Sequence, residues 1–74
     1  MTITLAQRPY ITGRDDRPYY YANAMDDNGK FYEVYWKIDH KSFFNGDDEF
    51  CNWDDYTVYP YGCSKPINAE LLWY

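Results

Sequence analysis

The sequence contains no long apolar run. No stretch of the 74-residue chain approaches the roughly 20 apolar residues that a membrane-spanning helix needs. The amino-terminal stretch Met1–Leu5 is also too short and too polar to be the apolar core of a secretory signal. We therefore expect a soluble, cytoplasmic protein.

Cysteine and histidine are scarce. The chain has two cysteines, Cys51 and Cys63, whereas secreted domains of this size usually carry about four or more. Free thiols are therefore expected; the alternative, a Cys51–Cys63 disulfide, would stabilise the fold by on the order of 3 kcal/mol. A zinc site built from both thiols, His40 and a carboxylate is disfavoured because no C-x-x-C pair anchors it. We expect no metal ion and no cofactor.

No catalytic motif is present. A histidine that performs acid–base chemistry needs a second group to orient it, and Asp39 would point away from His40 on a strand. Ser42 and Ser64 have no visible triad partner. The paired carboxylates lack the spacing of a calcium loop, and so short a chain has little room for a substrate cleft. We expect a protein that is not an enzyme and has no catalytic residue.

Aromatic residues, in contrast, are abundant: the chain has ten Tyr, three Trp and four Phe. A chain of this length forms one small domain, residues 1–74, and buries only about 60% of its unfolded surface. A few large rings can build a core that would otherwise need more residues. The tyrosines cannot all be interior, because each hydroxyl needs a partner or water. Exposed Tyr and Trp are residues that protein interfaces prefer.

One β-hairpin is evident. Asn28-Gly29 between two β-rich runs is the preferred two-residue hairpin loop, and it would pair Asp27 with Lys30. In that register Met25 faces Tyr32 and Tyr21 faces Trp36. The predicted apolar face contains Tyr32, Val34, Trp36 and Ile38 with Tyr19, Tyr21, Met25 and, as a polar exception, Asn23. The predicted mixed face contains Glu33, Tyr35 and Lys37 with Tyr20, Ala22 and Ala24.

The predicted fold is mainly β, or small α+β. It has an antiparallel sheet of three to five strands built on the Tyr19–Met25/Phe31–Ile38 hairpin, with one or two short helical segments. Further strands are expected at Ile3–Leu5 or Arg8–Thr12, and at Asp55–Tyr59. The stretch His40–Asn52 is ambiguous: Lys41–Phe44 suits one helical turn that stops at Gly46, and Asp47–Asn52 suits either a loop or the first turn of a short helix. The tail, Asn68–Tyr74, suits either a helix capped by Asn68 or an edge strand through Leu71–Tyr74.

Charge is unevenly distributed within the net charge of −5. Residues 1–14 carry two arginines and no acid, whereas residues 15–55 carry eleven acids against four cations. Such an acidic middle repels nucleic acid and anionic membranes, so direct binding to either is disfavoured. A simpler interpretation is that the acidity keeps an aromatic-rich protein soluble.

The densest charge lies between Asn45 and Asp55, where five carboxylates and no cation accompany two large aromatic residues. Carboxylates steer the encounter with a basic partner and aromatic anchors slow its dissociation; alternatively, Trp53 packs in the core. These charges would lie roughly 7 Å apart, against about 1.7 Å in duplex DNA, so mimicry of DNA needs further acids on the same side. The predicted partner-binding residues are Asp47, Asp48, Glu49, Phe50, Trp53, Asp54 and Asp55. A secondary acidic cluster is Asp26 and Asp27, at the hairpin tip.

In size, acidity and hairpin content the chain resembles phage-encoded inhibitors of bacterial defence, including the anti-CRISPR proteins. The run from Tyr20 to Ile38, followed by Cys51-Asn52-Trp53-Asp54, resembles small proteins of phages and prophages. The resemblance implies a non-enzymatic inhibitor in a host bacterial cytoplasm. Its partner would be a host protein with a basic nucleic-acid-binding surface, such as a CRISPR effector. It assigns no functional residue, because such inhibitors share no common motif.

The alternative is a homo-oligomeric structural or regulatory interaction module. The tyrosine-rich face and the Leu71–Tyr74 tail would then pair with a second copy through an exposed sheet edge and form a homodimer.

Overall fold

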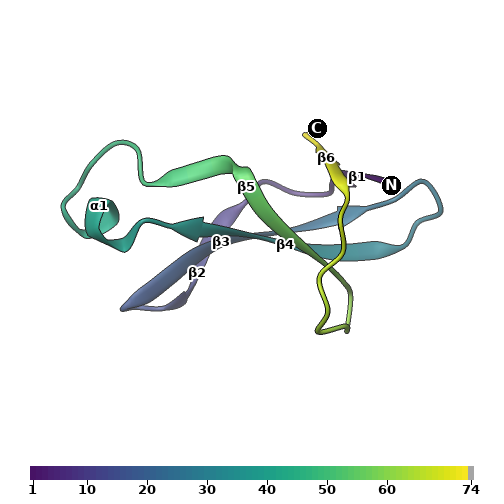
Figure 1. Ribbon diagram of the computed structural model, residues 1–74, viewed down its shortest axis with the longest axis horizontal. Helices are drawn as coiled ribbons and strands as arrows, with labels where there is room; N and C mark the ends of the chain where they lie inside the picture. The colour runs from purple at the N-terminus through teal and green to yellow at the C-terminus, as the bar shows by residue number, and fades with distance from the viewer. Residues whose placement is uncertain (74) are drawn as a thin grey trace.

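The computed structural model describes residues 1–73 and shows one curled six-stranded sheet with one short helix (Figure 1). The strands follow the order β5-β4-β3-β1-β6. β2 pairs with the first part of β3, and β1 pairs with its last residues. The mainly β prediction is confirmed, and both alternative third strands form. The sheet has more strands than expected, and it is mixed because β6 runs parallel to β1. The elements are β1 (Thr2–Leu5), β2 (Tyr10–Arg14), β3 (Arg17–Met25), β4 (Phe31–Ile38), α1 (His40–Phe44), β5 (Cys51–Pro60) and β6 (Glu70–Leu72).

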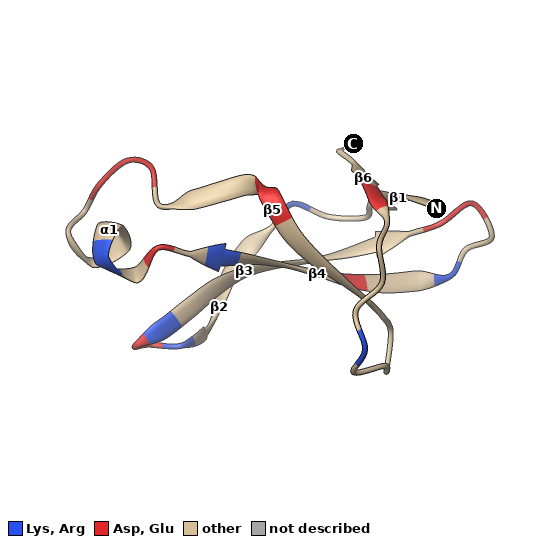
Figure 2. Cartoon of the chain, viewed as in Figure 1, with Lys and Arg blue, Asp and Glu red and all other residues tan. Residues whose placement is uncertain are grey.

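The β3–β4 hairpin forms, but its loop is one residue longer than Asn28-Gly29 indicates. The Asp26 carbonyl accepts from the Gly29 N–H at 3.1 Å, and the Asp26 N–H donates to the Lys30 carbonyl at 3.0 Å. Gly29 has φ of +80°, and no described non-glycine residue has positive φ, so Asn28 does not adopt the type I′ conformation. The loop is a type I turn followed by a left-handed glycine. Figure 2 shows this acidic tip at the end of the long axis opposite α1.

The longer loop shifts the pairing by one residue and reverses the faces of β3. Ala24 pairs with Tyr32 and Tyr20 pairs with Trp36, so the predicted register is wrong. Successive side chains of a strand alternate between faces, so this slip moves every β3 residue to the other side. The predicted apolar face of β4 is confirmed, since Tyr32, Val34, Trp36 and Ile38 are buried. On β3 the core side holds Tyr20, Ala22 and Ala24, and the other side holds Tyr19, Tyr21, Asn23 and Met25.

The core fills the inside of the curled sheet. Small residues of β3 lie beside the large rings of β4. Ala24 pairs with Tyr32, and Ala22 pairs with Val34. This alternation of small and large residues suits a narrow, strongly curved sheet, and full burial of a large side chain contributes roughly 3 kcal/mol. The buried hydrophobic residues are Ile3, Leu5, Ala22, Ala24, Tyr32, Val34, Trp36, Ile38, Val58 and Leu71.

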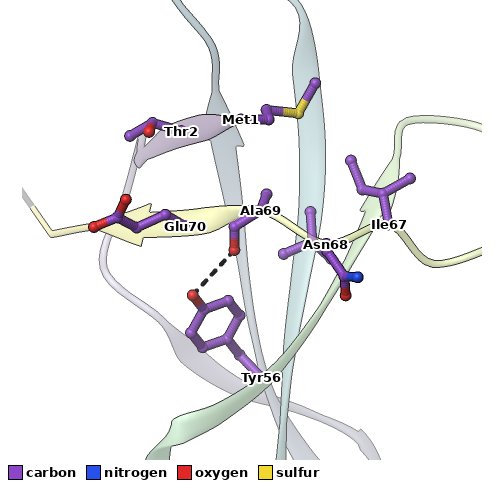
Figure 3. A pocket seen from close by; sticks show the side chains of 8 residues that line it. Met1, Thr2, Tyr56, Ile67, Asn68, Ala69 and Glu70 are labelled. Carbon is purple, nitrogen blue, oxygen red and sulfur yellow. Dashed lines mark hydrogen bonds between the residues drawn. The ribbon is translucent and has the colours of Figure 1, made fainter.

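The C-terminal segment closes the sheet. The Ile67 N–H donates to the Val58 carbonyl at 2.9 Å on the outer edge of β5, and β6 then pairs with β1. Between these contacts, the Tyr56 hydroxyl accepts from the Leu71 N–H and donates to the Ala69 carbonyl, both at 3.1 Å. Figure 3 shows Tyr56 reaching Ala69 beside an opening of about 470 Å³. One hydroxyl therefore replaces part of a strand–strand ladder.

Of the two alternatives for the tail, the edge strand forms and the helix does not. β6 pairs Ile3 with Leu71, and the Glu70 N–H donates to the Met1 carbonyl at 2.8 Å. Leu71 is buried, so pairing with β1 places an apolar side chain in the core. Tyr74 lies outside the described residues.

The predicted helical turn forms as α1, whose two ends are both capped. At its start the Asp39 carboxylate accepts from the Ser42 hydroxyl at 3.0 Å. At its end the N–H groups of Gly46 and Asp47 donate to the Phe43 and Ser42 carbonyls, which is a Schellman motif with a left-handed glycine. No helix in residues 1–73 has the length and apolar character needed to cross a membrane.

Replacing Tyr56 by Phe tests the closure. Tyr56→Phe leaves the Leu71 N–H and Ala69 carbonyl without their partner, so we expect the free energy of unfolding to fall by about 1–2 kcal/mol. The Leu71 amide should exchange with solvent faster, as measured by NMR. Tyr61, which is 71% exposed, offers the matched control, and Tyr61→Phe should change stability by less than about 0.5 kcal/mol. Equal stabilities of the two variants would contradict the bridging role.

Candidate partner-binding site

A large bulge in β5 positions Trp53 and Asp54. Trp36 of β4 pairs with Tyr56 of β5, but Ile38, two residues later, pairs with Cys51. The four residues of β5 between Cys51 and Tyr56 therefore have no paired partner on β4. The Trp36 indole N–H donates to the Trp53 carbonyl at 3.1 Å, which satisfies a backbone group that the bulge leaves unpaired. The side chain of a core residue therefore fixes the conformation of the bulge.

The ring of Trp53 packs against three other aromatic rings. Its centroid lies 4.5 Å from that of Tyr20, 5.4 Å from that of Trp36 and 5.6 Å from that of Trp73. Trp53 is 38% exposed. It is thus held by neighbouring rings while part of its surface faces solvent, so Trp53 is not a fully buried core residue.

Phe50 ends the loop that follows α1. Its carbonyl accepts from the Asp39 N–H at 2.7 Å, which holds the end of the loop against the start of α1. Its ring packs edge-on against Phe43 of α1 at 5.0 Å and lies nearly parallel to Tyr20 of β3, with centroids 6.2 Å apart. The short helix and the sheet together therefore fix the position of Phe50.

These elements enclose a hollow of about 410 Å³, which we call the acidic–aromatic hollow. It brings together five of the seven predicted partner-binding residues. Asp47 and Asp55 are exposed but do not line it. Tyr20 also lines the hollow, and the sequence analysis does not assign it to the site because the incorrect register places it on the mixed face. The lining residues are Tyr20, Asp48, Glu49, Phe50, Cys51, Asn52, Trp53 and Asp54.

The carboxylates of the hollow are exposed and have no cationic partner within the described chain. Asp48, Glu49 and Asp54 are all exposed, and no salt bridge joins them to a lysine or arginine of residues 1–73. Figure 2 shows acidic residues in the loop after α1 and again in the middle of β5. The lining of the hollow therefore carries negative charge without a lysine or arginine, and Lys37 lies beside Glu49 in the adjoining pocket.

The secondary acidic cluster lies elsewhere. Asp26 and Asp27 occupy the hairpin tip at the opposite end of the molecule, whose longest extent is 41 Å (Figure 2). The Asp26 carboxylate accepts from the N–H groups of Asn28 and Lys30 and from the Tyr32 hydroxyl. The Lys30 N–H, followed by the other two donors, holds the pKa of Asp26 below its usual range. Asp26 therefore stabilises the turn; it is half-buried, whereas Asp27 is exposed.

The remaining titratable candidates have local structural contacts. Cys51 and Cys63 are free cysteines, as expected, and burial raises the pKa of Cys51, which disfavours its thiolate. The His40 ring nitrogen Nε2 donates to the Pro18 carbonyl at 3.0 Å, which ties α1 to β3. Within residues 1–73 no group of three or more His, Cys, Asp or Glu side chains could hold a metal ion.

A second aromatic surface covers the opposite side of the sheet. We call it the tyrosine face; neighbouring ring centroids lie 5.2–5.7 Å apart across four strands. The Tyr21 hydroxyl lies 2.7 Å from Asn23 Oδ1 and 3.1 Å from Glu33 Oε1, and the Tyr35 hydroxyl donates to the other Glu33 oxygen at 3.5 Å. The tyrosine face consists of Tyr10, Tyr19, Tyr21, Tyr35 and Tyr59.

Comparison with protein-family models, with curated proteins and with solved structures found no match for this chain.

The tyrosine face should make the protein sensitive to alkali. Burial, followed by the hydrogen bond and charge of Glu33, raises the pKa of Tyr21 from 10.0 to about 12. Folding therefore favours the neutral phenol; that contribution to stability is complete below pH 10.0 and is lost as the pH rises to about 12. We expect the free energy of unfolding to fall across this interval.

The Glu33→Gln variant separates the effect of Glu33 on the pKa of Tyr21 from the effect of burial. It should move the pKa of Tyr21 back toward 10.0, but not fully, because burial remains. NMR titration of the tyrosine ring resonances measures both values. A Tyr21 that titrates near 10.0 in the unmodified protein, or that ignores the substitution, would contradict this account.

Proposed function

We propose that this protein is a non-enzymatic inhibitor that docks on the basic, nucleic-acid-binding surface of a host protein. The acidic–aromatic hollow lies at the centre of the contact. The observation that carries the proposal is the union of three carboxylates and three aromatic rings around one hollow, with no lysine or arginine in its lining. A bacterial defence protein, such as a CRISPR effector in the host cytoplasm, is the class of partner that the resemblance favours.

The uncompensated carboxylates support a cationic partner. Exposed Asp48, Glu49 and Asp54 add to a net charge of −5, so the field at this end attracts lysine- and arginine-rich surfaces at long range. Such attraction raises the association rate and weakens with salt. The same charge repels nucleic acid, so the protein competes with nucleic acid for a basic surface and does not bind nucleic acid itself.

The rings support a specific contact in addition to a general attraction. Trp53 is held by the hydrogen bond from Trp36 to its carbonyl and by its neighbouring rings, and Phe50 is held by Phe43 and Tyr20. Rings fixed before binding lose little conformational entropy when a partner covers them. Large aromatic residues in this condition are typical hot spots of protein interfaces.

The distribution of charge favours a local contact over imitation of a long duplex. The acids of the hollow and those of the hairpin tip lie at opposite ends of the long axis (Figure 2). Of the hairpin-tip pair, the Asp26 carboxylate is engaged by its own turn. A single basic patch on the partner, about the size of one hollow, is therefore enough for docking.

Charge reversal in the hollow tests the proposal. The double variant Asp48→Lys/Asp54→Lys should slow association with a captured bacterial partner about tenfold or more. The partner is first recovered from a bacterial lysate on the immobilised protein and identified. Rates are then measured by biolayer interferometry at low and high salt, together with displacement of labelled nucleic acid from the partner.

The matched control is Asp27→Lys/Glu70→Lys, which changes the net charge equally at two exposed positions outside the hollow. It should retain most of the association rate. The proposal is wrong if the two double variants behave alike, if salt leaves the affinity unchanged, or if the partner keeps its nucleic acid at saturation.

A homo-oligomeric module is the second candidate, favoured by the tyrosine face and by an open edge. In residues 1–73, β2 pairs with β3 alone, which leaves its other edge free. Tyr10 and Ile11 on β2 are 49% and 42% exposed, and Leu72 in the tail is 46% exposed. A stable dimer needs roughly 800 Å² from each partner, which this 5514 Å² surface can supply.

Sedimentation velocity separates the candidates. The inhibitor proposal predicts a monomer at micromolar concentration, with tryptophan fluorescence unchanged on dilution. A tight dimer that dissociates in an Ile11→Lys variant, and whose formation covers Trp53, would establish the oligomeric module instead. Phe31→Lys, on another strand at a position 50% exposed, provides the matched control.

A further inference from the structure

We infer that the acidic–aromatic hollow binds the guanidinium group of a partner arginine. This inference rests on the proposed function, because it assigns the side chain that would occupy the centre of that contact. The rings of Tyr20, Phe50 and Trp53 supply stacking surfaces. The carboxylates of Asp48, Glu49 and Asp54 supply acceptors at the rim.

The geometry of the rings suits a cation. Tyr20 and Phe50 lie within 5° of parallel with centroids 6.2 Å apart, and Trp53 is tilted 53° from Tyr20 at 4.5 Å. A cation is attracted to the face of an aromatic ring when it lies within about 6 Å of the centroid. Because the three rings are clustered, one side chain entering the hollow lies within reach of more than one of them.

The charge of the rim points to the same class of occupant. The lining holds three carboxylates and no lysine or arginine. The carboxylates are exposed, and no salt bridge joins them to cations of residues 1–73. An apolar or anionic side chain would leave these charges uncompensated beside it. A cationic side chain complements them while its stem covers the rings.

Arginine fits this combination better than lysine. The guanidinium group is planar, stacks on aromatic faces and gives up its hydration more readily than an ammonium group. Its fork of N–H donors also matches the two oxygens of a carboxylate. The volume of about 410 Å³ is enough for one such side chain and lies toward the lower end of the range for ligand sites.

The rings are ordered by the fold before any partner arrives. The Trp36 indole and the ring of Trp73 support Trp53 from one side, and Phe43 supports Phe50 from the other. Tyr20 is a strand residue packed against the core cluster, and burial, followed by the neighbouring Cys51, raises its pKa. It therefore remains a neutral ring at physiological pH.

Peptides that differ at one position test the inference. Short peptides with central arginine, lysine, trimethyl-lysine or citrulline are titrated into the whole isotope-labelled protein and followed by NMR. Citrulline keeps the planar shape of arginine without its charge. We expect the arginine peptide to bind about tenfold more tightly than the citrulline peptide and several-fold more tightly than the lysine peptide. The largest shifts should be at the Trp53 indole and the rings of Tyr20 and Phe50.

A matched pair of variants locates the binding. Phe50→Leu removes one ring of the hollow and should weaken the arginine peptide several-fold, with little effect on the lysine peptide. Phe31→Leu removes a half-exposed ring outside the hollow and should change neither. If Phe50→Leu does not fold, the ranking of the four peptides on the unmodified protein still decides the question.

The failure of this inference is distinguishable from that of the proposed function. Equal binding of the arginine and lysine peptides, lost in Asp48→Lys/Asp54→Lys but retained in Phe50→Leu, overturns the guanidinium assignment and leaves electrostatic docking intact. Tighter binding of trimethyl-lysine than of arginine also overturns it, as does the absence of binding by every peptide. Recovery and displacement of the bacterial partner are measured separately and decide the proposed function.

Discussion

The hydrogen bond between the Trp36 indole and the Trp53 carbonyl joins the core of this protein to its candidate site. Trp36 is only 1% exposed, and its N–H reaches the one place where β5 leaves the ladder. A buried indole donor needs an acceptor, and an unpaired bulge carbonyl needs a donor, so each satisfies the other. The position of Trp53, and with it one wall of the acidic–aromatic hollow, therefore depends on packing inside the sheet.

The sequence predicts the mainly β fold, but it does not predict the register of β3, the sixth strand or the parallel pairing of β6. Local chemistry suffices for the hairpin, the Gly46 helix stop and the apolar face of β4, because each depends on neighbours in the chain. The pairing of β3 depends on whether Asn28 adopts positive φ, and a type I turn with Gly29 alone left-handed is also compatible with Asn28-Gly29. That choice adds one residue to the loop. In the resulting register, Tyr19 and Tyr21 lie on the tyrosine face, and Ala22 and Ala24 lie in the core.

The site, like the fold, could be predicted where its residues are neighbours in the chain and not where it depends on strand pairing. A run of acids with interspersed aromatic residues identifies most of the hollow, because those residues are close in sequence. Tyr20 could not be placed there without the correct register, since it comes from a strand far from Phe50 along the chain. The sequence also could not show that the hairpin-tip acids lie at the opposite end, or that Asp26 is engaged by its own turn. Asn23 illustrates the cost of the register error: predicted inside, it lies 2.7 Å from the Tyr21 hydroxyl on the outer side.

The parallel pairing of β1 with β6 bears on the order of folding. It joins Thr2 to Glu70 and Thr4 to Leu72, the most distant segments of the described chain, whereas the β3–β4 hairpin needs only a tight turn. Closing so long a loop costs more entropy than closing a hairpin, so this pairing should be among the last to form. Until then Leu71 lies outside the core and the sheet lacks its parallel edge strand.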